Sequence, residues 1–357
     1  MSLARDSILI GALAIAAFGV DRRERTRIAH PRHGTPAVAS RSGAASVILV
    51  VSDGMRWQEV FRGADSLLVF GQSKALGGDP ARVHQRYWRP SVAERRAALM
   101  PFIWGTVARK GQLLGNRDAG SSVNVTNGLN FSYPGYNELL VGYPDPRINS
   151  NRVGPNPNVT VFEWLNRREG FRERVAAVGA WDAFADIFNA RRSAIDVHAR
   201  REDPLDERSH RTALDLLNEV RPRALFVAYV ETDDWAHRGR YDRTLDAVHA
   251  VDGYLAQLWS AVQAHPQYRG RTTLIFTADH GRGRTTRDWT DHNRDIAGAH
   301  ETFVAMIGPA VPAIGEARDV HLVAQAQVAA TVAAAVGLDY RTEVRRAAPA
   351  IRAVSVR

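Results

Sequence analysis

The sequence predicts an α/β fold of three layers, in which helices cover both faces of a mostly parallel central sheet. Continuous apolar runs at 45–54, 223–230 and 272–281 are typical of strands buried on both faces of such a sheet. Helical patterns alternate with these runs, and between 243 and 265 apolar residues recur every three or four positions. A length of 357 residues with 45% hydrophobic residues is enough to fill the core of such a fold.

The remaining elements follow from the same patterns. The fold is expected to begin near Ala45, with the strand that ends in Ser-Asp-Gly. A further strand is expected at 302–309, in the sequence TFVAMIGP. Helices are expected around residues 92–109, 137–141, 161–168, 207–220, 243–265 and 322–336.

The two ends of the chain differ in composition from its middle. Residues 1–42 combine an apolar run of about thirteen residues with an arginine-rich segment that has no periodicity. We interpret them as a signal peptide or membrane anchor followed by a basic linker. The protein is therefore expected to be periplasmic or secreted, and to contact a membrane only if this segment is uncleaved. Residues 43–340 form the expected folded domain, and 341–357 a basic, solvated tail.

Charge and cysteine content exclude several classes of protein. The formal net charge is +9, but residues 1–42 hold seven arginines against three acidic residues, so the expected domain is only mildly basic. No nucleic-acid partner is expected from such a distribution, whereas a small anionic ligand fits it. The chain has no cysteine, which excludes disulfides, thiol catalysis and cysteine-ligated metals. Any metal ion must be held by His, Asp, Glu or a hydroxyl group.

Polar residues follow three of the predicted strands. Asp53 follows the first, Asp233 and His237 follow the second, and Asp279 and His280 follow the third. Ligands of open α/β sheets collect outside the carboxyl ends of the strands, so these side chains are expected to converge. Asp233 and His237 are also four residues apart, which on a helix directs both side chains to one face.

Each of these residues alone has an ordinary explanation, such as a helix N-cap or a surface ion pair. The segment 289–303 adds His292 and His300, which by themselves would be loop histidines. Together the aspartates and histidines form an oxygen and imidazole set that suits Zn²⁺ or Mn²⁺, and two ions fit their number.

Ser132 lies in the sequence NFSYPGYNELLVG, before a Tyr-Pro-Gly turn and an apolar run. Such a stretch is ordinary turn chemistry at the entry to a helix. A serine at a strand-to-helix turn is also where a nucleophile benefits from backbone N–H groups and the helix dipole. The stretch alone fits both readings.

The order of these motifs resembles the alkaline phosphatase superfamily, especially its nucleotide pyrophosphatase/phosphodiesterase-like branch. SDGM, FSYPGYNELLVGYP, DDWAH, ADHG and a late histidine before IGP follow one another from about Ser46 to Pro309. The resemblance implies an alkaline phosphatase-like catalytic domain over 43–340. It also implies two divalent metal ions, with Zn²⁺ preferred and Mn²⁺ as the alternative.

The resemblance assigns the ligands residue by residue. One ion would be held by Asp53, Asp279 and His280, with Ser132 Oγ as the fourth ligand. The other would be held by Asp233, His237 and His292. His300 is the alternative to His292, and Asp234 the alternative to Asp233, although Asp234 breaks the four-residue spacing to His237.

The implied activity is hydrolysis of a small-molecule phosphate ester through a phosphoseryl intermediate on Ser132. Asn151 lies near the position of an asparagine that donates to a phosphoryl oxygen in that branch. Trp235, Tyr133 and Tyr136 are candidates for stacking on the substrate or for packing. The sequence leaves open whether the substrate is a monoester or a diester.

Three alternatives share this fold. The sulfatase branch uses a C/S-x-P-S-R motif, and Gly135 and Tyr136 stand where that motif needs Ser and Arg, which disfavours sulfatase chemistry. A phosphoryl transferase would pass the same group to an alcohol. A non-catalytic anion-binding protein would keep the metal residues without the reaction, but the intact Ser132 argues against it.

Overall fold

The structure is a computed structural model that describes residues 45–71, 78–152, 154–309 and 311–352. The predicted signal peptide or anchor at 1–42 lies outside the described residues. Among the described residues, no helix combines the length and the apolar character needed to cross a membrane.

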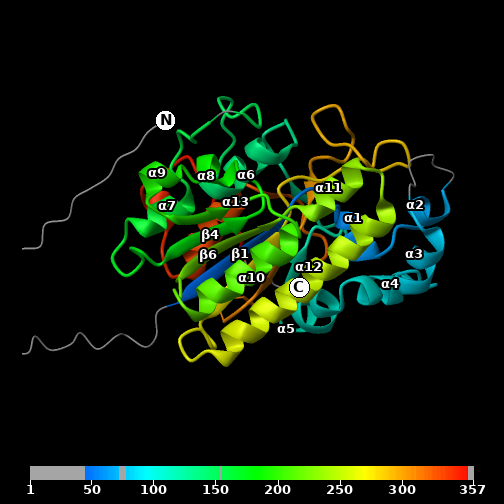
Figure 1. Cartoon of the computed structure of the whole chain (residues 1–357), viewed down its shortest axis with the longest axis horizontal. Helices are drawn as coiled ribbons and strands as arrows, with labels where there is room; N and C mark the ends of the chain where they lie inside the picture. The colour runs from blue at the N-terminus through cyan, green and yellow to red at the C-terminus, as the bar shows by residue number, and fades with distance from the viewer. Residues whose placement is uncertain (1–44, 72–77, 153, 310, 353–357) are drawn as a thin grey trace, which may run out of the picture. The chain divides into compact units, whose positions relative to one another are not determined.

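Strands and helices are interspersed along the described part of the chain (Figure 1). The strands are β1 (Ser46–Ser52), β2 (Gly111–Leu114), β3 (Val123–Asn124), β4 (Val175–Gly179), β5 (Asp196–Ala199), β6 (Ala224–Tyr229), β7 (Thr272–Thr277), β8 (Glu301–Thr302), β9 (Val304–Ile307), β10 (Gly315–Glu316) and β11 (Val323–Ala324). The helices are α1 (Trp57–Arg62), α2 (Ser66–Phe70), α3 (Pro80–Arg86), α4 (Val92–Leu99), α5 (Ala108–Lys110), α6 (Ser132–Val141), α7 (Val161–Asn166), α8 (Phe184–Ile187), α9 (Ala190–Ser193), α10 (Leu205–Asn218), α11 (Glu231–His237), α12 (Tyr241–Ala264) and α13 (Gln327–Ala335).

The described strands form one large and one small sheet. The large sheet has eight strands in the order β10-β2-β9-β7-β1-β6-β4-β5, and the small sheet has the order β11-β3-β8. In the large sheet β7, β1, β6, β4 and β5 run parallel, whereas β9 is antiparallel to both β7 and β2. This mostly parallel sheet confirms the predicted fold class.

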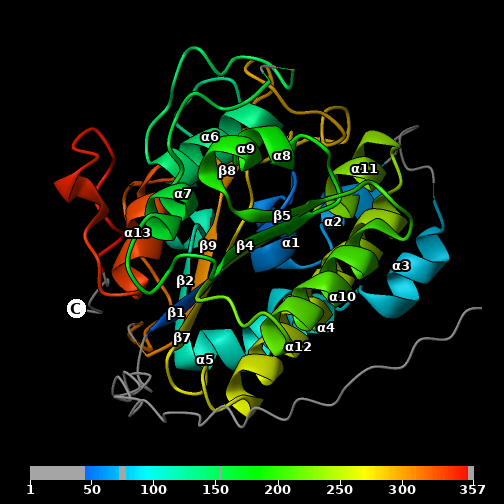
Figure 2. The ribbon, with the colours of Figure 1, turned by 60° about the vertical axis from the view of Figure 1, so that its left-hand side comes forward.

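Alternate residues of β1 face two different cores, one on each side of the sheet. Ile48 and Val50 belong to one cluster, which the apolar faces of α10 and α12 complete. Val47 and Leu49 belong to the other, which α6, α7 and α13 cover. Figure 2 shows α10 and α12 on one side of the sheet and α6, α7 and α13 on the other. The three-layer prediction therefore describes the molecule correctly.

Two elements differ from their predictions. The helix expected at 92–109 is divided into α4, a π-helical turn at Ile103–Val107 and α5. The tail beyond 340 was expected to be solvated, but Ala347 is buried and its neighbour Ala348 donates its N–H to Gly142 O over 2.8 Å. The expectation of a solvated tail is thus wrong for its first part, because this part packs on the C-terminal end of α6.

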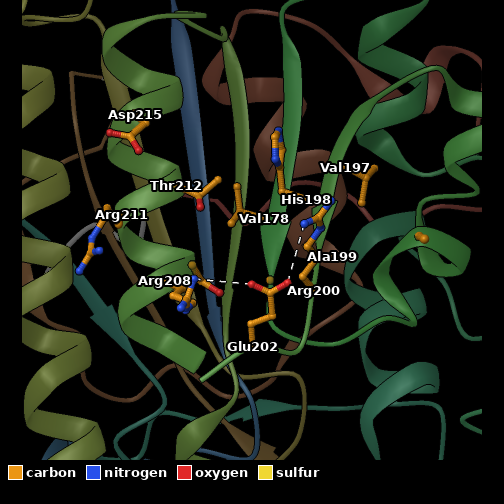
Figure 3. A pocket seen from close by; sticks show the side chains of 13 residues that line it. Val178, Val197, His198, Ala199, Arg200, Glu202, Arg208, Arg211, Thr212 and Asp215 are labelled. Carbon is orange, nitrogen blue, oxygen red and sulfur yellow. Dashed lines mark ion pairs between the residues drawn. The ribbon is translucent and has the colours of Figure 1, made fainter. Parts of the chain in front are cut away.

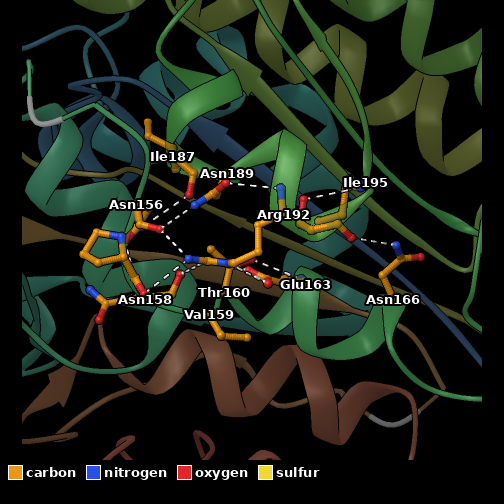
Figure 4. A network of polar contacts seen from close by, with 12 residues as sticks. Asn156, Asn158, Val159, Thr160, Glu163, Asn166, Ile187, Asn189, Arg192 and Ile195 are labelled. Atoms are coloured by element: carbon orange, nitrogen blue, oxygen red, sulfur yellow. Dashed lines mark hydrogen bonds and ion pairs between the residues drawn. The ribbon is translucent and has the colours of Figure 1, made fainter.

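A polar network around Arg192 connects α9 to the loop that leads into α7 (Figure 4). The Arg192 guanidinium donates to Asn158 O over 2.6 Å and to Glu163 Oε2 over 2.7 Å, which fixes the loop that leads into α7. From the same loop, Asn156 Nδ2 donates to Asn137 Oδ1 in the middle of α6 over 3.1 Å. The network therefore holds α6, the helix that begins with Ser132, in a defined position.

Candidate active site

The carboxyl ends of three adjacent strands bring the predicted metal ligands together. Strand β1 lies between β7 and β6 in the sheet. Asp53 directly follows β1, Asp279 and His280 follow β7, and α11 with Asp233 begins two residues after β6. Thr232 Oγ1 donates to Asp53 O over 2.6 Å, which joins the start of α11 to the end of β1.

Asp53, Asp279 and His280 form a first, fully buried group. One ligand atom of each lies within 4.8 Å of the others. His280 Nε2 is 3.3 Å from Asp53 Oδ1 and 3.5 Å from Asp279 Oδ2. Each of these three atoms is buried without a hydrogen-bond partner in the described part of the chain. Buried polar atoms rarely stay unpaired, so three that face one another fit a bound cation.

The other atoms of these side chains are held by protein groups. His280 Nδ1 lies 3.0 Å from Gly281 O, so it carries the proton and leaves Nε2 free as a ligand. Asp279 Oδ1 accepts from Gly54 N over 3.0 Å, and Asp53 Oδ2 accepts from the Tyr136 hydroxyl over 3.2 Å. Every ligand in the group is therefore oriented by a second contact.

Burial raises the pKa of both carboxyl groups in the metal-free protein. Desolvation is the main cause at Asp53 and the negative charge of Asp233 adds to it. At Asp279 desolvation is again the main cause, and the charge of Asp53 adds to it. A divalent cation would reverse both effects, because it stabilises the ionised carboxylates.

Asp233, His237 and His292 form a second group that is more open to solvent. His237 Nε2 lies 3.2 Å from Asp233 Oδ2 and 3.0 Å from His292 Nε2, and the His237 side chain is 44% exposed. Asp233, His292 and His280 also bring one ligand atom each within 4.8 Å of one another. His280, whose ring stacks on that of His292 at 4.0 Å, thus lies between the two groups.

His292 is prepared as a neutral ligand. Its Nδ1 lies 3.2 Å from Asn130 O, which leaves Nε2 directed at Asp233 and His237. Burial, with the neighbouring His280, lowers the pKa of His292 to about 2.

The two alternative ligands lie elsewhere. His300 belongs to neither of the candidate groups found among the described residues. Asp234 forms an ion pair with Arg201 at 2.6 Å. The structure thus brings His292 and Asp233, rather than these alternatives, into the second group.

Arg282, which sequence reasoning missed, also lies in the site. Its side chain is 1% exposed and forms an ion pair with Asp233 Oδ1. Burial would raise the pKa of Asp233, but the Arg282 charge and the hydrogen bond from His237 lower it below its ordinary value. The available sequence signal was the position of Arg282 directly after ADHG, where an arginine is ordinarily an exposed loop residue.

Gly54 permits this close approach. Its φ of +58° is in the left-handed region, and a Cβ there would lie 2.5 Å from Asp233 Oδ1 and 2.9 Å from Arg282 Nε. Only a residue without a side chain leaves room for both groups beside β1.

Contacts of the residues on either side of Ser132 bring the start of α6 near both groups, while the contact of Ser132 Oγ with a metal ion stays a prediction. Ser132 is the first residue of α6 and is 8% exposed. Two residues earlier, Asn130 O contacts His292 Nδ1, and four residues later, on the same helix face, Tyr136 contacts Asp53. Gly135 packs on the first group, because Gln325 Nε2 donates to Gly135 O over 3.0 Å and to Asp279 O over 2.9 Å.

Asn151 lies against the first turn of α6. Its Oδ1 accepts from Tyr133 N, the residue after Ser132, over 2.9 Å, and the side chain is exposed. The structure thus brings Asn151 to Ser132, while its contact with a phosphoryl oxygen stays a prediction.

The aromatic candidates divide into two kinds. Tyr133 and Tyr136 are 1% and 0% exposed, so they pack in the core and cannot stack on a ligand. Trp235 is half-buried and lines a cavity of 520 Å³ together with Asp234 and Arg238. Trp235 lies two residues from both Asp233 and His237 on α11, so its side chain projects from the other face of this helix, and its contact with a substrate stays a prediction.

A separate cavity of 470 Å³ lies at the β4–β5 end of the sheet, against α10 (Figure 3). Its arginines are paired, since Glu202 lies 3.7 Å from Arg200 and 3.5 Å from Arg208. None of the residues that line it is a predicted site residue, so this cavity is not the candidate active site.

Comparison with solved structures shows the same fold at low sequence identity. A murine ectonucleotide pyrophosphatase/phosphodiesterase 5, in an inactive form complexed with AMP, is 12% identical with a TM-score of 0.51, covering 86% of this chain and 97% of that chain. The lipoteichoic acid synthase LtaP from Listeria monocytogenes is 10% identical with a TM-score of 0.54, covering 84% and 73%. A 2-O GAG sulfatase is 12% identical with a TM-score of 0.53, covering 84% and 72%.

No curated protein matches the sequence significantly. The sequence profile of the Metalloenzyme superfamily, however, matches residues 154–337, which is more than half of the chain. These residues include Asp233, His237, Asp279, His280 and His292 of the candidate site. The chain therefore belongs to the metalloenzyme superfamily, with the alkaline phosphatase-like fold that its sequence motifs predicted.

Proposed function

We propose that this protein is a metal-dependent phosphoric ester hydrolase in which Ser132 is the nucleophile. The observation that carries the proposal is the set of three buried, unpartnered ligand atoms on Asp53, Asp279 and His280, beside the helix that Ser132 begins. The proposed substrate is a small-molecule phosphate ester that the protein meets in the periplasm or outside the cell.

Two divalent ions, Zn²⁺ or Mn²⁺, would occupy the site. Asp53, Asp279 and His280 would hold one, with Ser132 Oγ completing the set, and the second group would hold the other. When bound, such ions lower the pKa of a coordinated oxygen and neutralise the charge that develops on a phosphoryl group. The donor set of carboxylate and imidazole, without thiolate, fits these ions.

Ser132 Oγ would attack phosphorus in line with the ester oxygen. The new Oγ–P bond forms as the bond from phosphorus to the ester oxygen breaks, and the proton lost by the Ser132 hydroxyl passes through solvent to the leaving oxygen. A water molecule then attacks the phosphoserine, which releases phosphate and restores the Ser132 hydroxyl. The overall reaction consumes one water molecule and gives an alcohol and a phosphate.

The first turn of α6 would bind the phosphoryl oxygens. Helix N-termini favour anions because their first N–H groups lack helical partners. Asn151 already accepts from the N–H of Tyr133, so its Nδ2 would be the group that donates to a phosphoryl oxygen.

A sulfatase reaction is disfavoured by the packing of Gly135 as well as by the sequence motif. A Cβ on this residue would lie 2.4 Å from Asp279 O, so the serine that the sulfatase motif needs here does not fit without displacing α6. The fold shared with sulfatases therefore does not extend to their nucleophile motif.

The test is hydrolysis of matched aryl phosphate monoester, aryl phosphate diester and aryl sulfate substrates by the metal-loaded protein. Replacing Ser132 by Ala should lower phosphoester kcat by at least about a thousandfold, since a covalent nucleophile is lost. Ser66→Ala is the matched control, because Ser66 also begins a helix but is exposed and outside both groups. Equal rates for Ser132→Ala and Ser66→Ala, or turnover of the sulfate alone, would refute the proposal.

A further inference from the structure

Arg282 is a buried cation at the centre of the second group. Its guanidinium donates to Asp233 Oδ1 and, over 3.2 Å, to Asp233 O. It also donates to Thr290 O, two residues before His292, so it joins the helix and the loop that supply the group. Its Nε is buried with no hydrogen-bond partner among the described residues.

Arg282 occupies one of the two Asp233 oxygens that a metal ion in the second group could use. Asp233 Oδ1 is the carboxylate oxygen 3.8 Å from His292 Nε2, so it faces the position of an ion that Asp233 and His292 would hold together. An ion bound there would have to displace the guanidinium from Oδ1 or share the oxygen with it. Either event places a divalent charge next to a fixed positive charge in a partly buried site, which opposes binding.

The first group has no such competitor. Its ligand atoms Asp53 Oδ1, Asp279 Oδ2 and His280 Nε2 are all unpartnered, and no arginine or lysine donates to them among the described residues. Metal binding in the first group gives three unpartnered buried atoms a partner. Metal binding in the second group instead disturbs the existing ion pair between Arg282 and Asp233.

We propose that Arg282 is a built-in cation that competes with the second metal ion for Asp233, so that the two groups fill at different metal concentrations. This inference rests on the two-metal part of the proposed function. The first group then holds a tightly bound ion, and the occupancy of the second follows the free metal concentration around the protein.

The experiment is a calorimetric titration of the metal-free full chain with Zn²⁺, in the presence of a competing chelator. The wild type should bind two ions with dissociation constants that differ by at least about tenfold. Arg282→Gln should reduce the ratio of the two dissociation constants by at least about tenfold, because the competing charge is gone. Most of this change should be a decrease in the larger dissociation constant. Arg282→Lys keeps a charge and should retain most of the ratio.

The matched control is Arg284→Gln. Arg284 lies two residues away and pairs with Glu301, outside both groups, so this variant should bind Zn²⁺ as the wild type does. If circular dichroism shows that Arg282→Gln folds poorly, the titration is repeated with Arg282→Met, which has an uncharged side chain of similar length.

An unchanged or wider ratio in the uncharged variants would overturn the inference, as would equal narrowing in Arg284→Gln. A single bound ion in both wild type and Arg282→Gln would overturn it too. The titration contains no ester, so these outcomes are independent of whether Ser132→Ala abolishes hydrolysis.

Discussion

Asn151 has two chemical functions in one side chain. Its oxygen accepts from Tyr133 N, which completes the first turn of α6, and its amide nitrogen is the donor proposed for a phosphoryl oxygen. Substitution can separate these functions, because aspartate keeps the acceptor and removes the donor.

We expect Asn151→Asp to lower kcat/KM for phosphate esters by about a hundredfold, through loss of a donor and repulsion of the anion. The melting temperature should change little, since the Tyr133 N–H keeps its acceptor. Steady-state kinetics and thermal unfolding check both parts. A variant with full activity would show that Asn151 only caps the helix.

The convergence of Asp53, Asp233, Asp279 and His280 was predictable, because each follows an apolar strand and parallel strands end at one edge of the sheet. His292 follows no predicted strand and was indicated only by the family resemblance. Arg282 was not predictable as a site residue, because an arginine after a strand end is ordinarily exposed. Asp233, which follows another strand, comes next to it only in the folded chain. The Tyr136 hydroxyl was missed for the same reason, since its contact with Asp53 joins residues far apart in sequence.

Asp252 joins two elements of the helical layer, α12 and the π-helical turn at Ile103–Val107. Its carboxylate accepts from Phe102 N over 2.7 Å and from Ile103 N over 2.9 Å. Burial raises the pKa of Asp252 from 3.8 to about 6 despite these hydrogen bonds. The folded state therefore binds a proton more tightly than the unfolded state does.

The sign of the pH effect follows from this raised pKa. The protonated Asp252 adds stability below pH 3.8, and this contribution is lost as pH rises to about 6. Asn cannot ionise, so the free energy of unfolding of Asp252→Asn should gain about 2 kcal/mol relative to the wild type between pH 4 and 7. Urea unfolding of the metal-free proteins across this range measures the difference. A difference that does not change with pH would contradict the assignment.

Among the elements, the long strands were predictable from their continuous apolar runs and α12 from its periodicity. Strand β4 was not predicted, since its apolar run Val-Ala-Ala-Val-Gly is short, nor was β5, since its residues alternate between exposed and half-buried at the sheet edge. The helix expected at 92–109 is interrupted at Pro101, which has no N–H to donate and disfavours helix in the residue before it.

At the scale of the whole molecule, metal binding is coupled to protonation of the site. The raised pKa values of Asp53 and Asp279 mean that these carboxyls hold protons more tightly than ordinary aspartates do, so the first ion competes with protons for them. Asp233, with a lowered pKa, and His292, with a pKa of about 2, are already deprotonated.

We therefore expect the first equivalent of Zn²⁺ to release more protons than the second. Calorimetric titration at one pH in two buffers with different ionisation enthalpies measures this release. The rise in melting temperature on adding metal should also be larger at pH 8 than at pH 5.5, because ionised, buried carboxylates destabilise the metal-free fold. Equal proton release for both equivalents would contradict the assignment of the two groups.

The most direct test of Ser132 as the nucleophile is to trap the covalent intermediate. The metal-loaded protein is mixed with a phosphorus-labelled aryl phosphate, quenched in acid within the first turnover, digested and mapped by mass spectrometry. We expect phosphoserine at Ser132 in the wild type and in Ser66→Ala, and no labelled peptide in Ser132→Ala. Label on another residue, or continued turnover by Ser132→Ala at the wild-type rate, would contradict it.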